Sequence, residues 1–210
     1  YPILIFLLLL IAYFSLASGI GSYSRFRFPV DPYIFILASL GILRPRENDK
    51  IKKLLIITQR VDKNDFNLGF FHRWIEEFSK KFEKVEVIAL GVGAYSLPSN
   101  VSVYSLGKEK GASKLLQILH FFKLIITLRY DRVFIHMTPV WGLFGGLWWV
   151  LTRKPTYLWY THYKMQAGLW MLGHYAKRLF CATPQSLPQY EGNPKKVVVG
   201  HGIDLSYWPK

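Results

Sequence analysis

The stretch that decides the fold is residues 53–58, KLLIIT, a nearly unbroken run of apolar side chains of strand length. A strand that is apolar at successive positions is buried on both faces, as the central strands of a parallel sheet are. Residues 67–82 follow, where Leu68, Phe71 and Ile75 recur at helical spacing among charged residues. A buried strand followed by an amphipathic helix predicts the first unit of a parallel α/β sheet.

Strand-length apolar runs and helix-length segments keep alternating through the rest of the chain. This alternation is typical of a sheet that carries helices on both faces. We therefore predict the α/β class, with a Rossmann-like, doubly wound parallel sheet. Further strands are predicted at residues 85–90, 101–106, 132–136, 156–160, 178–182 and 195–199, and further helices at 114–129 and 141–152.

The region before the sheet has the composition of a membrane anchor. Residues 2–20 are apolar and uncharged, which is enough to cross a hydrocarbon core of about 30 Å, and they predict a transmembrane helix rather than a signal peptide. The shorter apolar run 33–43 predicts an interfacial helix or half of a hairpin. A basic, proline-containing linker follows and predicts a cytosolic location. The expected domains are an anchor with linker, 1–51, and a folded domain, 52–210.

Composition limits the possible partners. The chain has 210 residues, 51% of them hydrophobic, and a net charge of +14, which together indicate a bilayer as partner. Nucleic acid is disfavoured, because the basic residues are scattered through apolar segments and form no single stripe. The single Cys181 forms no internal disulfide, and no Cys/His spacing indicates zinc. Phosphate-loop and nucleophile-elbow motifs are also absent from the sequence, which disfavours nucleotide hydrolases and serine hydrolases.

Candidate binding residues follow the predicted strands, because open parallel sheets bind ligands beyond the carboxyl ends of their strands. Gly69 and Phe70 open the first predicted helix. A glycine there allows the backbone to approach a ligand at the helix amino end, or simply permits tight packing, and these alternatives weigh equally. The GVG sequence at 91–93 lacks the third glycine of a dinucleotide fingerprint and predicts a turn.

Two histidines stand directly after neighbouring predicted strands. His136 is followed by Thr138, and Thr161 by His162. A lone histidine at a strand end is more often structural than catalytic, but two at corresponding ends are expected to face one crevice. The other histidines that lie in predicted helices are interpreted as surface or packing residues. The tryptophans around residue 159 are interpreted as core, although aromatic side chains near a membrane surface also suit an interfacial belt.

Four segments in order resemble one family: KLLIITQ…NLGFF (53–71), DRVFIHMTP (131–139), KPTYLWYTH (154–162) and KKVVVGHGIDLSYW (195–208). They are similar to the N-terminal domain of family 4 glycosyltransferases, retaining GT-B enzymes that include phosphatidylinositol mannosyltransferases and many transferases of polysaccharides and lipid-linked sugars. The resemblance covers residues 52–208.

The resemblance implies roles for individual residues. His136 would be the catalytic residue, hydrogen-bonding the reacting sugar and stabilising developing charge. Hinge positions would be Gly202 and Asp204. No metal is implied, and no cofactor other than the nucleotide-sugar donor substrate. The implied contacts to acceptor or substrate are Gly69, Phe70, Thr138, Thr161 and His162.

The sequence departs from the family by carrying none of the donor-binding second domain, and Glu76 and Glu83 do not replace its paired glutamates. We expect either a truncated product or a separate chain that supplies the donor domain. The expected function is sugar transfer from a nucleotide-sugar to a membrane-associated lipid or polysaccharide acceptor, on the cytoplasmic face. The alternative is a non-catalytic, membrane-anchored acceptor-binding or scaffold subunit. The third hypothesis is a membrane-tethered domain of the flavodoxin or response-regulator type. It is disfavoured because this sequence lacks the clustered N-terminal aspartates of such regulators and has no phosphate-binding loop.

Overall fold

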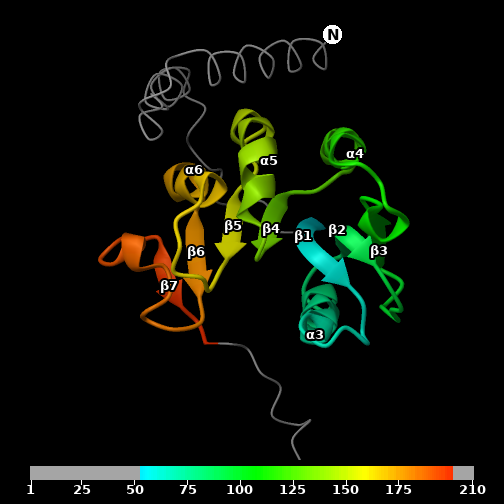
Figure 1. The fold of residues 1–210 in the computed structure, drawn as a ribbon, viewed down its shortest axis with the longest axis horizontal. Helices are drawn as coiled ribbons and strands as arrows, with labels where there is room; N and C mark the ends of the chain where they lie inside the picture. Colours follow the sequence, from blue (N-terminus) through cyan, green and yellow to red (C-terminus); the bar gives the residue numbers. More distant parts are fainter. Residues whose placement is uncertain (1–52, 201–210) are drawn as a thin grey trace, which may run out of the picture. The chain divides into compact units, whose positions relative to one another are not determined.

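The protein is described by a computed structural model over residues 53–200. Seven parallel strands form one sheet in the order β3-β2-β1-β4-β5-β6-β7, so the order reverses between β1 and β4 (Figure 1). The predicted α/β class with a parallel, Rossmann-like sheet is confirmed. The strands are β1 Lys53–Val61, β2 Lys84–Val92, β3 Val101–Ser105, β4 Arg132–His136, β5 Thr156–Trp159, β6 Arg178–Cys181 and β7 Lys196–Val198.

Helices cover both faces of the sheet. Figure 1 shows α3 on one face and α4, α5 and α6 on the other. This arrangement follows from the strand order, because the chain leaves β1 towards β2 and later crosses back from β3 to β4. The helices are α3 Gly69–Ser79, α4 Lys114–Thr127, α5 Pro139–Leu151 and α6 Ala167–Tyr175, with 3-10 turns η1 Lys108–Lys110 and η2 Pro188–Tyr190.

The core beneath α3 is built from alternate residues of the central strands. Leu54 and Ile56 of β1 and Val87 of β2 are buried against Phe71 and Ile75 of α3. Burying each such side chain contributes about 1.5–3 kcal/mol. This packing fixes the first turn of α3 against the sheet and thereby places the aromatic residues of that turn near the carboxyl ends of the strands.

Two strands are longer than the sequence predicts. β1 continues to Val61, because Arg60 pairs with Gly91 across the sheet while its side chain lies outside and forms ion pairs with Asp62 and Asp65 at 2.9 and 3.1 Å. β2 likewise runs through residue 92, so the prediction of a turn at 91–93 is wrong. A polar side chain at a strand end is compatible with pairing when only the backbone is buried.

Helix α6 was not assigned a range from sequence, because its glycines lower helix propensity. The structure gives those glycines a packing role against α5. A Cβ on Gly168 would lie 2.2 Å from the carbonyl oxygen of Pro139, and one on Gly142 of α5 would lie 2.5 Å from Leu172. Close approach of the two helices therefore requires the residues that weaken the sequence signal.

The membrane prediction concerns residues outside the described range. Among residues 53–200, no helix is both long enough and apolar enough to cross a bilayer. The predicted spanning segment 2–20, the apolar run 33–43, and the hinge residues Gly202 and Asp204 all lie outside the described residues.

Candidate functional site

The site lies at the carboxyl edge of the sheet, where β1 and β4 are neighbours. In open α/β sheets this reversal of strand order creates the crevice in which ligands bind. His136 is the last residue of β4, and its Nδ1 lies 3.1 Å from the Oγ1 of Thr58 in β1. Both side chains are fully buried. The hydrogen bond fixes the orientation of the imidazole across the switch point.

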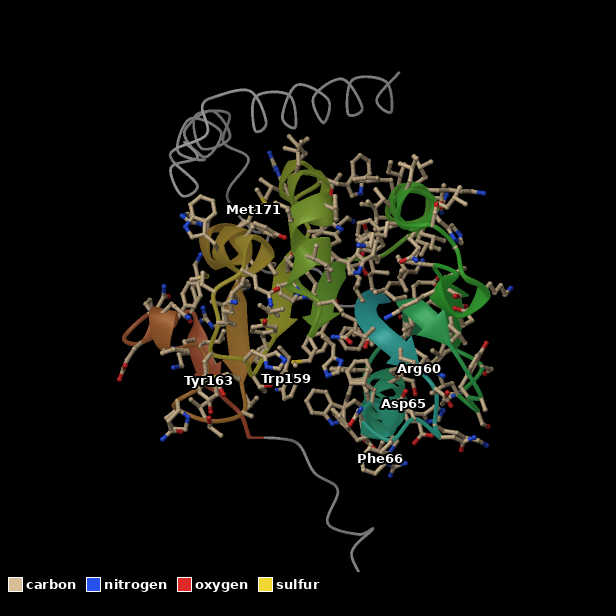
Figure 2. All side chains as sticks on the ribbon, in the orientation of Figure 1. Arg60, Asp65, Phe66, Trp159, Tyr163 and Met171 are labelled. Atoms are coloured by element: carbon tan, nitrogen blue, oxygen red, sulfur yellow. The ribbon has the colours of Figure 1, made fainter. Side chains whose placement is uncertain are left out.

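Aromatic rings enclose the imidazole of His136. Phe71 stacks on one face with a centroid separation of 3.7 Å and an interplanar angle of 7°, and Trp159 lies near the other at 5.2 Å and 25°. Phe70 and Trp74 approach at 5.9 Å each. Three of these rings come from the first half of α3. Trp159, labelled in Figure 2, ends β5 at the same edge of the sheet.

Two hydrogen-bonding atoms of this enclosure have no partner within residues 53–200. They are Nε2 of His136 and Nε1 of Trp159, and both are buried. Buried polar atoms are nearly always hydrogen-bonded, and an unmade bond costs about 1–3 kcal/mol. Two such atoms on adjacent rings indicate a place where a hydroxyl-bearing ligand would gain hydrogen bonds that the protein itself does not supply.

Burial controls the charge of His136. Desolvation lowers the pKa of His136 to about 3, so the imidazole is neutral at physiological pH. A neutral ring has one donor nitrogen and one acceptor nitrogen. The chemistry available to His136 is therefore hydrogen bonding rather than charge stabilisation by an imidazolium.

The residue after His136 has a strained backbone. Met137 has φ of 57°, a left-handed conformation that costs a side-chain-bearing residue about 1–3 kcal/mol. Its N–H donates to the Trp159 carbonyl at 3.0 Å, and its carbonyl accepts from Nε2 of Gln59 at 3.2 Å. Contacts from two strands therefore hold the turn between β4 and α5, and strain of this kind clusters at functional sites.

The structure separates the two predicted histidines. His162 is exposed and its ring packs edgewise against Tyr160 at 5.3 Å, whereas His136 is fully buried. The expectation that both face one open crevice is therefore wrong, because the α3 aromatics cover one of them. Thr138 is also buried and donates to the His136 carbonyl at 3.3 Å, and half-buried Thr161 donates to Sδ of Met137 at 3.7 Å.

Backbone N–H groups at the amino end of α3 already donate hydrogen bonds within the protein. The carboxylate of Asp65 accepts from the backbone N–H of Asn67 at 2.9 Å and of Leu68 at 2.8 Å, and its carbonyl accepts from Gly69 N at 2.9 Å. A Cβ on Gly69 would lie 3.1 Å from the Lys63 carbonyl oxygen. These contacts support the packing alternative for Gly69 over phosphate binding at this helix end.

Sequence reasoning missed several members of the site. Thr58 was predicted to end a strand, Gln59 lay outside every predicted element, and Trp159 was interpreted as core. A hydroxyl closing an otherwise apolar run, as in KLLIIT, was the available signal for Thr58. Within residues 53–200, no group of three or more His, Cys, Asp or Glu side chains is arranged to hold a metal ion.

The fold and site define an open, Rossmann-like α/β domain with a candidate site at its topological switch point. No protein-family model and no curated protein matches the chain. Among solved structures, it is similar to the crystal structure of Acinetobacter baumannii MurG, with a TM-score of 0.48 and 16% sequence identity. The match covers 71% of this chain and 45% of the MurG chain, so the chain spans less than half of that protein.

Proposed function

We propose that this domain forms the acceptor side of a glycosyltransferase that moves a sugar from a nucleotide-sugar to a membrane-associated lipid or polysaccharide. The observation that carries the proposal is the pair of buried, unpartnered nitrogens on His136 and Trp159 at the switch point. Sugars offer hydroxyls to such groups and apolar ring faces to aromatic side chains. The resemblance of residues 52–208 to family 4 glycosyltransferases supports the choice of reaction.

In this proposal His136 hydrogen-bonds a hydroxyl of the transferred sugar. The acceptor oxygen bonds to the anomeric carbon while the bond from that carbon to the nucleoside diphosphate breaks, with retention of configuration as the resemblance implies. The proton of the acceptor hydroxyl passes to the phosphate oxygen that departs. A fixed hydrogen bond in a water-excluded site stabilises charge that develops in this step. Because Nε2 is buried, one of the enclosing rings must move for the sugar to reach it, and we assign this movement to Phe70, which is 45% exposed and lies edge-on to the imidazole.

The proposal also assigns the acceptor contacts, the donor-binding domain, the hinge and the membrane anchor. His162 and Thr161 would contact the acceptor, and His162 is exposed as this role requires. The donor nucleotide would be held by a second domain or a separate chain, with Gly202 and Asp204 as hinge, and no metal or further cofactor is part of the proposal. An anchor at residues 2–20 would keep the domain on the cytoplasmic face of the membrane.

A second candidate is a non-catalytic acceptor-binding or scaffold subunit. The observation in its favour is that His136 has no exposed surface. A buried histidine that never meets substrate would serve packing alone. The two candidates differ in whether changing His136 affects sugar transfer at unchanged stability.

The test uses the protein made from its complete reading frame, in native membranes with a lipid extract and a panel of nucleotide-sugars. Nucleoside diphosphate release is measured for the wild type, His136→Gln and the control His72→Gln. His72 is also buried, but its Nε2 accepts from Ser96 N at 3.1 Å. We expect a loss in kcat of about 10²-fold or more for His136→Gln alone. Equal rates would reject the role of His136, and lipid binding without transfer from any donor would favour the scaffold.

A further inference from the structure

Basic residues mark the beginnings of the strands. Parallel strands all begin at one edge of a sheet, so residues scattered along the sequence become neighbours there. From β2 to β7 this edge is roughly 24 Å long at the usual strand spacing. The interpretation that the basic residues form no single stripe is therefore wrong. The first residues of β1, β2, β4, β6 and β7 are Lys53, Lys84, Arg132, Arg178 and Lys196, and Lys154 lies two residues before β5.

The loops that lead into the strands add more cations to the same edge. Arg129 follows α4, Arg153 follows α5 and Lys177 follows α6, and all three are exposed. Between residues 53 and 200, no ion pair involves any of these three side chains. We call the whole set the basic edge: Lys53, Lys84, Arg129, Arg132, Arg153, Lys154, Lys177, Arg178 and Lys196.

Several cations of the basic edge donate hydrogen bonds to neutral oxygen atoms rather than to carboxylates. Lys84 donates to Oγ of Ser102 at 2.6 Å and Arg132 donates to the Tyr157 hydroxyl at 2.6 Å. Lys154 donates to the Tyr130 carbonyl at 2.6 Å. A hydroxyl or carbonyl orients a cation without cancelling its charge, so these side chains are fixed in place and remain able to attract anions.

A hollow of about 530 Å³ opens at the same edge, beside the starts of β1 and β4. Lys53, Arg129 and Lys154 provide its cations, and the acidic Asp131 among its lining residues accepts from the Lys53 backbone N–H at 2.9 Å. Apolar side chains complete the lining. They are Ile125, Ile126, Leu128 and Trp148, and Tyr130 and Thr152 make up the rest. The hollow thus combines cations with apolar surface.

We propose that the basic edge binds the surface of a bilayer that contains anionic phospholipids, and that the hollow receives a lipid headgroup. A row of cations along one edge of the sheet matches an extended anionic surface. Apolar lining matches the glycerol and first acyl carbons below a phosphate, whereas a nucleic-acid phosphate would leave it unused. The described chain also enters the domain at this edge, at Lys53, directly after the basic linker. The proposal is independent of sugar transfer.

The test uses the full chain in nanodiscs of phosphatidylcholine alone or of phosphatidylcholine with phosphatidylglycerol. Hydrogen–deuterium exchange is followed in the loops at 128–131, 152–155 and 176–178. We expect several-fold slower exchange in the anionic discs than in the neutral discs, and loss of that difference at high salt because the attraction is screened. Neutral discs control for any tethering by the N-terminal segment.

Two triple variants locate the surface. Arg129→Gln, Arg153→Gln and Lys177→Gln together should abolish the lipid-dependent protection. The control, with Lys63→Gln, Lys108→Gln and Lys110→Gln, removes three exposed charges from loops beyond the carboxyl ends of the strands and should retain it. Equal exchange in both discs, loss of protection in the control variant, or stronger protection by single-stranded RNA than by anionic lipid would overturn the proposal. The salt series on the wild type remains decisive if the first variant folds poorly.

Discussion

The hydroxyl of Thr58 lies 3.1 Å from Nδ1 of His136, and this contact joins the two strands between which the order of the sheet reverses. The residues are 78 positions apart in sequence. Their hydrogen bond settles which imidazole nitrogen faces the protein and leaves Nε2 for another partner. This contact between neighbouring strands therefore orients the imidazole together with the rings of Phe71 and Trp159 that lie on its two faces.

The Thr58 contact can be measured by a double-mutant cycle. Thr58→Val removes the hydroxyl at nearly constant volume and should reduce the free energy of unfolding by about 1–3 kcal/mol, because Nδ1 of His136 loses its partner. His136→Phe keeps an aromatic ring in the stack. Urea unfolding of the full chain in detergent, for both single variants and the double variant, should give a coupling of about 1 kcal/mol. Additive effects would show that the contact contributes nothing.

The buried imidazole makes stability depend on pH. Burial lowers the pKa of His136 to about 3, below the unfolded value near 6.5, so the unfolded state binds the proton more readily. The contribution of the neutral imidazole to the free energy of unfolding is fully present above pH 6.5 and is lost as the pH falls towards 3. Between pH 6 and pH 4 the wild type should lose roughly 2–3 kcal/mol more than His136→Gln. Parallel urea midpoints against pH for the two proteins would contradict this.

Phe70 should control access to the imidazole. It is partly exposed and lies edge-on to His136 at 5.9 Å. Phe70→Ala should increase the rate of His136 modification by diethyl pyrocarbonate several-fold, followed by peptide mass spectrometry. The matched control is Phe66→Ala, because Phe66 is fully exposed and has no ring contact in residues 53–200. Unchanged modification in Phe70→Ala would mean that other aromatic residues close the site.

Gly91 near the end of β2 and Gly93 just after the strand should respond differently to a methyl group. A Cβ on Gly93 would lie 2.0 Å from Oδ2 of Asp62, which accepts from Arg60 at 2.9 Å, whereas a Cβ on Gly91 would make ordinary contacts from 3.5 Å. Gly93→Ala should therefore destabilise the protein by about 1–3 kcal/mol through overpacking. Gly91→Ala should change stability by much less. The thermal unfolding midpoints of both variants test this difference, and equal midpoints would contradict the prediction.

Hydrophobic patterning predicted most of the sheet, because the central strands are buried on both faces. The range of β4, residues 132–136, was predicted to the residue. The pattern failed where burial and pairing diverge: Arg60 pairs in β1 although its side chain is outside. It also failed for α6, where helix packing requires glycines that weaken the local signal.

Strand ends indicated His136, but the sequence could not show that aromatic side chains cover it. Phe71 belongs to the apolar stripe of α3 and has the spacing of an ordinary core residue. Its stacking on His136 depends on the angle at which α3 crosses the sheet, which local patterns do not specify. The basic edge was hidden for a related reason, because strand pairing alone brings distant lysines and arginines together.

Arg132 begins β4 and His136 ends it, so roughly 13 Å of extended chain separates the basic edge from the candidate site. A strand in the middle of a sheet cannot lengthen or shorten. If β4 stands upright on a surface that the basic edge contacts, this separation is therefore a fixed height above that surface. Such a spacer would select acceptors by reach. Hydroxyls that project at least that far from the bilayer would be modified, and those nearer the lipid would be passed over.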